Sequence, residues 1–362
     1  MRPKNLTVTY NFNAGPSALP EEVLKEAAHA ISNYNNTGLS ILEIGHRTPL
    51  FQAIMDEARL LVRELMHLDS NHEVLFLHGG ATTQFMQLPM NLLNVRDNAA
   101  YADTGVWSSK AIKEARLYGN INIVCSSKES GYLHIPKDFA VPNDVKYFHI
   151  TTNNTIYGSQ WQNIPNVSVP LVADMSSDIL SRELNFNAFD VIYAGAQKNI
   201  GCAGVNLVVV NNNILGKVKH PIPSIMDYQN HIKAGSMLNT PPVFAVYVSM
   251  LTLRWLKNKG GVREIEVLNK EKANCLYNEI DRNGLFHGTV AVEDRSKMNV
   301  CFKAVTEEIE KLFLRFVQQN NIVGIQGHRL AGGFRASLYN AIPLSSVEVL
   351  VDLMRTFEKN VG

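Results

Sequence analysis

Seven short apolar runs between residues 73 and 213 constrain the fold of this chain more than any other feature. They read EVLFLHGG, AAYADTG, INIVCSS, VKYFHITTNN, VPLVADMSS, DVIYAGAQ and VNLVVVNNN, and several are separated by segments long enough for a helix. Apolar strands interleaved with helices are typical of a largely parallel sheet covered on both faces. We therefore expect an α/β fold with a mostly parallel seven-stranded sheet, whose ligands bind at the carboxyl ends of the strands.

The length of 362 residues favours two domains, because a single hydrophobic core rarely grows that large. Helical apolar spacing is present at residues 20–34 and 50–65, before the strand-like runs begin. From about Gly261 a new pattern of long helices and one strand-like run, MNVCFKAV, predicts a smaller α+β domain. We assign residues 16–260 to the large domain, and residues 1–15 together with 261–362 to the small one.

Charge and cysteine content argue against several functional classes. The chain has 34 Lys and Arg against 33 Asp and Glu, a formal charge of +1, so neither nucleic acid nor a membrane surface has an electrostatic basis as a partner. The four cysteines lie far apart and form no CxxC pair, which argues against a zinc site or a disulfide framework. No apolar leader or membrane-spanning run is present, and we expect a cytoplasmic protein without a metal.

Polar residues follow several of the predicted strands. Gly79 and Gly80 lead into a helix that begins near Thr82, and the free N–H groups of such a helix start can bind an anion. Asp174 ends one strand, and Lys198 follows another inside a glycine-rich turn. In isolation, turn chemistry is the more common explanation of the two glycines and a solvated charge that of the lysine, whereas a helix cap explains Asp174 as well as a cofactor contact does.

Trp107 also follows a strand, where its indole could stack on a planar ring or pack into the core. An anion site, an aromatic platform, a strand-end carboxylate and a strand-end lysine together suit pyridoxal 5'-phosphate. That cofactor needs a Schiff-base lysine such as Lys198 and an acidic partner, such as Asp174, that keeps its ring nitrogen protonated. We interpret the four features as one crevice.

From NFNAGPSALP to its C-terminus, the chain resembles the phosphoserine aminotransferase family of fold-type I pyridoxal phosphate enzymes. The most distinctive segments are GLSILEIGHR, HGGATTQF, DMSSDILSR, IYAGAQKNIGCAG, GSMLNTPP and GHRLAGGFRASLYNA. The resemblance implies transamination between glutamate and 3-phosphohydroxypyruvate, both small molecules, giving 2-oxoglutarate and O-phosphoserine. It also implies a homodimer with shared active sites, and isologous dimers are the most common oligomers.

The resemblance further implies a role for individual residues toward the cofactor. Lys198 would form the Schiff base, Asp174 would pair with the ring nitrogen, Trp107 would stack on the ring and Thr155 would hydrogen-bond its phenolic oxygen. The residues expected to hold the cofactor phosphate are Ala81, Thr82 and Gln197, joined by Asn239 and Thr240 from the second subunit.

Substrate binding requires fixed cations, because both amino acids carry a second anionic group. By resemblance, Arg335 would bind the α-carboxylate, for which its planar guanidinium is well suited. His328 and Arg329 would bind the distal phosphate or the glutamate side chain, and His46 and Arg47 would join from the partner subunit. Some relatives carry an arginine or a glycine in the glycine turn, where this chain has Ala81 and Thr82, so any charged contact at that position is lost here.

Three other functions are compatible with parts of this pattern. A lyase resembling cysteine desulfurases would share the aldimine lysine but needs a reactive cysteine on a mobile loop, whereas Cys202 lies between Gly201 and Gly204, which favour close packing. A non-catalytic regulator could keep pyridoxal phosphate as a ligand. A nicotinamide-dependent dehydrogenase is disfavoured because the GxGxxG fingerprint is missing. The sequence leaves open whether 4-phosphohydroxythreonine is a second substrate.

Overall fold

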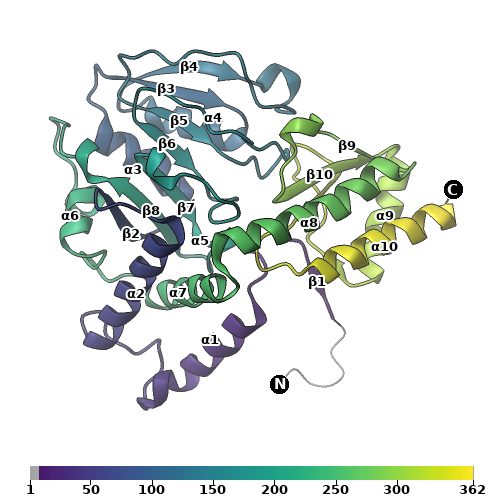
Figure 1. Ribbon diagram of the computed structural model, residues 1–362, viewed down its shortest axis with the longest axis horizontal. Helices are drawn as coiled ribbons and strands as arrows, with labels where there is room; N and C mark the ends of the chain where they lie inside the picture. Colours follow the sequence, from purple (N-terminus) through teal and green to yellow (C-terminus); the bar gives the residue numbers. More distant parts are fainter. Residues whose placement is uncertain (1–7, 362) are drawn as a thin grey trace.

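The computed structural model describes residues 8–361 and is built around one large sheet (Figure 1). Its seven strands are β2 (His72–His78), β3 (Asn98–Asp103), β4 (Asn120–Ser126), β5 (Phe148–Thr151), β6 (Leu171–Asp174), β7 (Val191–Gly195) and β8 (Val205–Asn211). They lie in the order β2-β8-β7-β6-β5-β3-β4. All neighbouring pairs are parallel except those of β8, which is antiparallel to both β2 and β7. The prediction of a mostly parallel seven-stranded sheet is confirmed.

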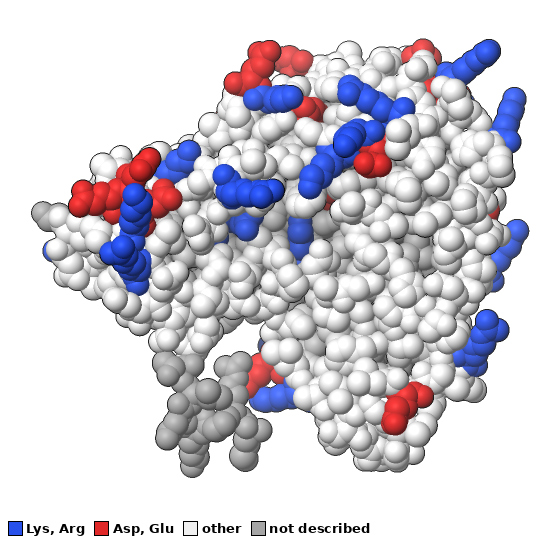
Figure 2. All heavy atoms as spheres, turned by 180° about the vertical axis from the view of Figure 1, so that it is seen from behind, with Lys and Arg blue, Asp and Glu red and all other residues white. Residues whose placement is uncertain are grey.

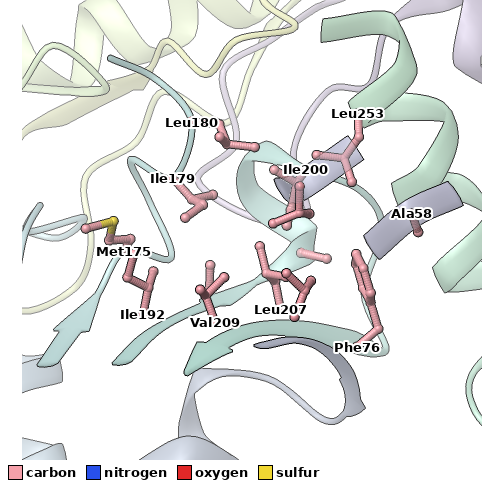
Figure 3. Packing of buried hydrophobic residues seen from close by; sticks show 14 of the residues in the cluster. Ala58, Phe76, Met175, Ile179, Leu180, Ile192, Ile200, Leu207, Val209 and Leu253 are labelled. Carbon is pink, nitrogen blue, oxygen red and sulfur yellow. The ribbon is translucent and has the colours of Figure 1, made fainter. Parts of the chain in front are cut away.

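Helices cover both faces of this sheet (Figure 1). The helices in this part of the chain are α1 (Glu21–Asn33), α2 (Pro49–Met66), α3 (Ala81–Leu92), α4 (Val106–Ala115), α5 (Ala196–Asn199), α6 (Tyr228–Lys233) and α7 (Val243–Asn258). Of these, α1 packs against α7. Figure 3 shows Phe76, Leu207 and Val209 from β2 and β8 packed toward Ala58 of α2 and Leu253 of α7. The alternate residues of the same strands, among them Leu75 and Val208, belong to a second cluster that includes residues of α3 and α4. Both faces of the strands are therefore buried, which explains their continuous apolar sequence.

The C-terminal third of the chain forms a separate α+β unit with its own hydrophobic cluster. It contains α8 (Gly261–Arg282), β9 (Phe286–Gly288), β10 (Asn299–Ala304), α9 (Glu307–Gln319), β11 (Ile322–Val323), β12 (Phe334–Ser337) and α10 (Leu344–Val361). Strands β12, β10 and β9 form one antiparallel sheet, and β1 (Tyr10–Asn11) pairs with β11 in parallel. The N-terminal segment therefore joins this unit, and Phe12 is part of its core.

Helix α8 contacts both units. Val262 and Ile265 in its first turns pack into the core beside the large sheet, whereas Leu276 and Ile280 pack into the C-terminal core. The domain boundaries at residues 15/16 and 260/261 remain a prediction.

The surface carries both signs of charge. On the face shown in Figure 2, Lys and Arg side chains are interspersed with Asp and Glu side chains. Over residues 8–361, no helix has the length and apolar character needed to cross a membrane, and no cluster of three or more His, Cys, Asp or Glu side chains could hold a metal.

Candidate active site

A cavity of about 340 Å³ lies at the carboxyl ends of the strands, as expected for this type of sheet. The large sheet contributes Thr151 and Asp174, the last residues of β5 and β6, and the C-terminal unit contributes His328 and Arg335. Of the residues predicted from the sequence, nine line this cavity: Ala81, Thr82, Trp107, Thr155, Asp174, Gln197, Lys198, His328 and Arg335.

Lys198 lies in the short helix α5, directly after β7, and its Nζ donates a hydrogen bond of 2.8 Å to Thr155 Oγ1. Burial lowers the pKa of this lysine to about 8; Asp174 and Asp178 oppose the shift, while the nearby Arg335 adds to it. A lysine with such a pKa is partly neutral near physiological pH, so its amine can act as a nucleophile and accept a proton.

Asp174 is 4% exposed. Its burial raises the pKa of the carboxyl group, an effect opposed by the charge of Lys198 and by hydrogen bonds from Ser176, whose N–H lies 2.9 Å from Asp174 Oδ1. A buried carboxylate is costly unless a cation balances it. Asp174 is therefore well placed to pair with a cationic group in the cavity.

The predicted anion site is the connection from β2 to α3, and its residues Gly80, Ala81 and Thr82 line the cavity. Gly79 has a φ of +92°, and a side chain at this position would collide with Thr83, so glycine is required. A Cβ on Gly80 would meet nothing within 4 Å, which leaves the start of α3 open toward the cavity. The N–H groups of Ala81 and Thr82 in the first turn have no intrahelical partner and are available to an anion.

Trp107, at the start of α4, forms another wall of the cavity. Its ring centroid lies 5.7 Å from Lys198 Nζ and 6.5 Å from the ring centroid of Phe85. The indole Nε1 is buried without a hydrogen-bond partner. The indole is thus available to stack on a planar group next to Lys198.

Arg335, on β12, connects the C-terminal unit to the lysine. Its Nη1 donates a hydrogen bond of 3.2 Å to the carbonyl oxygen of Thr155, the residue whose hydroxyl contacts Lys198. Its Nε is buried without a partner. Partial burial lowers the pKa of His328, and repulsion from Arg335, Arg329 and Lys110 lowers it further.

Five predicted residues do not line the cavity of this chain: His46, Arg47, Asn239, Thr240 and Arg329. Arg47 is exposed, and its Nε donates to His46 Nε2 at 3.4 Å. The carbonyl oxygen of the exposed Thr240 accepts a hydrogen bond of 2.5 Å from His78 Nε2. Four of the five were expected to act from a second subunit, and their roles remain predictions.

The sequence reasoning missed several residues of the cavity wall, including Gly15, Asn153 and Ser176. Gly15 has a φ of +135°, and a Cβ there would lie 3.1 Å from Lys198 Cγ. For Ser176 a signal was available, because a serine two residues after a strand-ending aspartate commonly closes a turn onto that carboxylate.

The cavity residues fit pyridoxal 5'-phosphate. They provide an amine, a buried carboxylate, an indole plane and an open helix N-terminus, which suit the aldehyde, ring nitrogen, ring face and phosphate of that cofactor. Buried polar atoms without a partner, Thr151 Oγ1, Trp107 Nε1 and Arg335 Nε, surround the same space. Buried polar atoms in folded proteins normally have a hydrogen-bond partner, and a polar ligand in this cavity is one way to supply it.

Comparisons with known proteins agree with this assignment. The family model described as Aminotransferase class-V matches residues 9–350. The phosphoserine aminotransferase of Flavobacterium johnsoniae is 55% identical, over 97% of this chain and 99% of that protein. The solved phosphoserine aminotransferase of Bacillus circulans subsp. alkalophilus is 42% identical, with a TM-score of 0.95 and coverage of 98% of this chain and 99% of that one.

A phosphoserine aminotransferase from Trichomonas vaginalis, solved with bound pyridoxal phosphate, is 35% identical with a TM-score of 0.90; the match covers 96% of this chain and all of that one. Both the family model and these relatives extend over nearly the whole sequence. The chain therefore belongs to the class-V aminotransferases, and within them to the pyridoxal phosphate-dependent phosphoserine aminotransferases.

Proposed function

We propose that this chain transfers the amino group of L-glutamate to 3-phosphohydroxypyruvate, giving O-phospho-L-serine and 2-oxoglutarate in serine biosynthesis. The observation that carries the proposal is the position of Lys198, whose amine of lowered pKa lies in a cavity with a buried carboxylate and with cations from the C-terminal unit. Both amino acids are anionic at two ends, and the cationic side of this cavity suits them.

Pyridoxal phosphate, when bound, supplies an electron-withdrawing ring that makes the α-proton of the amino acid acidic. Lys198 Nζ would hold the cofactor, and as a free amine it would move a proton to and from the substrate α-carbon. With a pKa of about 8, about half of this amine is neutral at pH 8 and can accept that proton. Asp174 would pair with the ring nitrogen of the cofactor, and its negative charge would then stabilise the protonated ring.

We assign substrate orientation to the cations of the C-terminal unit. The unpartnered Nε of Arg335 supports its role as the α-carboxylate ligand. His328 and the exposed Arg329 follow each other in the loop before β12, and we assign them to the distal anionic group of the substrate. Ala81, Thr82 and Gln197 are the proposed ligands of the cofactor phosphate, and Thr155 of the phenolic oxygen.

We further propose a homodimer in which a second copy of the chain supplies its His46, Arg47, Asn239 and Thr240 to each site. Support comes from the exposure of Arg47 and Thr240. Leu39 and Leu42, which precede Arg47 in the sequence, are also exposed, at 45% and 61% in the single chain. Light scattering of the purified protein tests this: a mass of one chain contradicts it. We also propose that the enzyme acts on 4-phosphohydroxythreonine, as in pyridoxine biosynthesis. We propose a location in the cytoplasm.

The deciding experiment follows the absorbance of the cofactor-loaded protein. Adding glutamate alone should bleach the yellow form, and adding 3-phosphohydroxypyruvate should restore it with formation of O-phosphoserine. The Lys198→Ala variant should abolish turnover, and a comparable rate in that variant contradicts the proposal. A stable yellow colour with both amino acids indicates the non-catalytic binder instead.

Release of sulfide from cysteine would indicate the desulfurase-like lyase. The structure disfavours this alternative, because burial raises the pKa of the Cys202 thiol and a nucleophilic cysteine needs the opposite shift. Gly201 is also closely packed, since a Cβ there would lie 3.2 Å from Ser249 Cα.

A further inference from the structure

Lys110 lies beside Trp107, a residue of the cavity wall, and has no role in the reaction as described so far. It is on α4, one turn after Trp107, and its Nζ is 4.5 Å from the centroid of the Trp107 ring. Trp107 lines the cavity, so the exposed ammonium group of Lys110 is held by a cation–π contact at the edge of the site.

Lys110 is also without a neutralising partner. Within residues 8–361, no carboxylate forms an ion pair with its ammonium group, although Glu114 is available at i+4 on the same helix. The side chain instead extends back toward the N-terminal end of α4, where the helix dipole disfavours a positive charge. A cation in this position is therefore not explained by the stability of the helix.

Other cations converge on the same region. The charge of Lys110 acts on His328 together with those of Arg335 and Arg329, and all three repel a proton on that imidazole. Asp174 and Asp178, the carboxylates that act on Lys198, are buried. A group of like charges in this arrangement is costly until an anion binds among them.

The glycine turn gives no charge to this region, because position 82 is an uncharged threonine. We propose that Lys110 is a specificity-determining residue that binds the distal phosphate of the phosphorylated substrate from the α4 side of the site. This inference rests on the proposed function. The ammonium group of Lys110 would bind a phosphate, with a charge of about −1.5 to −2, more strongly than the singly charged carboxylate of the glutamate side chain.

The test compares Lys110→Met with Lys110→Arg and with the control Lys113→Met, which removes an exposed lysine from the same helix. Stopped-flow absorbance of each cofactor-loaded protein gives an apparent Kd and a limiting rate for the half-reactions with O-phospho-L-serine and with L-glutamate. The absorbance of bound cofactor before mixing verifies that all variants are equally loaded.

Lys110→Met should raise the apparent Kd for O-phospho-L-serine about tenfold, which corresponds to about 1.4 kcal/mol. The apparent Kd for glutamate should change less than about twofold and both limiting rates should persist, as expected when a contact binds ground state and transition state alike. Lys110→Arg should restore most of the affinity. The affinity of the unmodified protein for O-phospho-L-serine should also fall more steeply with salt than that of Lys110→Met.

An unchanged Kd for O-phospho-L-serine in Lys110→Met, or an equal loss for both amino acids, overturns the inference while the unmodified protein still reacts with both. Failure of the unmodified protein to react with O-phospho-L-serine overturns the proposed function, and the role of Lys110 with it.

Discussion

Replacing Asp174 with asparagine should slow the reaction strongly without unfolding the protein. The carboxylate is 4% exposed, so water cannot replace its charge beside a cationic ring. Loss of one preorganised electrostatic contact typically costs about 2.7–4 kcal/mol, or about 10²–10³ in kcat. Asparagine keeps an oxygen for the N–H of Ser176 and avoids the cost of burying a charge, so the fold should be preserved.

The same substitution should also change the pH dependence. The negative charge of Asp174 now raises the pKa of Lys198 against the effect of burial. Without that charge the pKa of Lys198 falls below its value of about 8. The rise in rate with pH, which follows deprotonation of this amine, should therefore occur at lower pH in the variant. Steady-state rates between pH 6 and 9.5, with circular dichroism as a folding control, measure both effects.

Asp138→Asn, which changes an exposed aspartate, is the matched control and should behave as the unmodified protein. A kcat within about threefold of normal, together with an unshifted pH profile, would refute the role of Asp174 as the partner of the ring nitrogen.

Two further predictions concern stability. Lys272 is buried, its Nζ donates to the carbonyl oxygens of Leu338 and Tyr339, and burial lowers its pKa to about 7. In the unfolded chain the pKa of this lysine is about 10.4, so between pH 7 and 10 the unfolded chain binds more protons than the folded one. The free energy of unfolding should therefore rise with pH over this range, by up to about 1.4 kcal/mol per pH unit. Urea unfolding at pH 7, 8 and 9 should show that the free energy of unfolding rises less with pH in Lys272→Met than in the unmodified protein. An equal rise in both proteins would contradict the prediction. Gly201→Ala should lower the melting temperature, at a cost of about 1–3 kcal/mol, because the new methyl group collides with Ser249; an unchanged melting temperature would show that the backbone shifts freely.

Much of the fold was predictable because the strands of the large sheet are short, apolar and separated by turn residues. The helix at residues 243–258 was not recognised, since α7 is buried nearly all round and shows no polar face from which a period could be read. The direction of β8 was missed as well. Nine residues separate Gly195 from Val205, which is too short for a parallel crossover. This spacing alone indicates that β7 and β8, if adjacent, are antiparallel.

The site was predictable to the extent that strand ends define it. Asp174 ends β6, while Trp107 and Lys198 follow β3 and β7, and the sheet brings all three together at one edge. Arg335 was found by resemblance, because it lies on a strand of the other unit, and no pattern within a sequence reports a contact between units. Lys110 was missed because a lysine on an amphipathic helix normally indicates a solvated surface.

The reversed strand β8 has a mechanical consequence for the lysine. Residues 196–204 connect two adjacent inner strands, so both ends of the segment that carries Lys198 are anchored to the same rigid surface within nine residues. In a long crossover connection the backbone around Lys198 would be more mobile. We therefore expect the amine of Lys198 to change position mainly by rotation about its side-chain bonds, with little movement of the backbone.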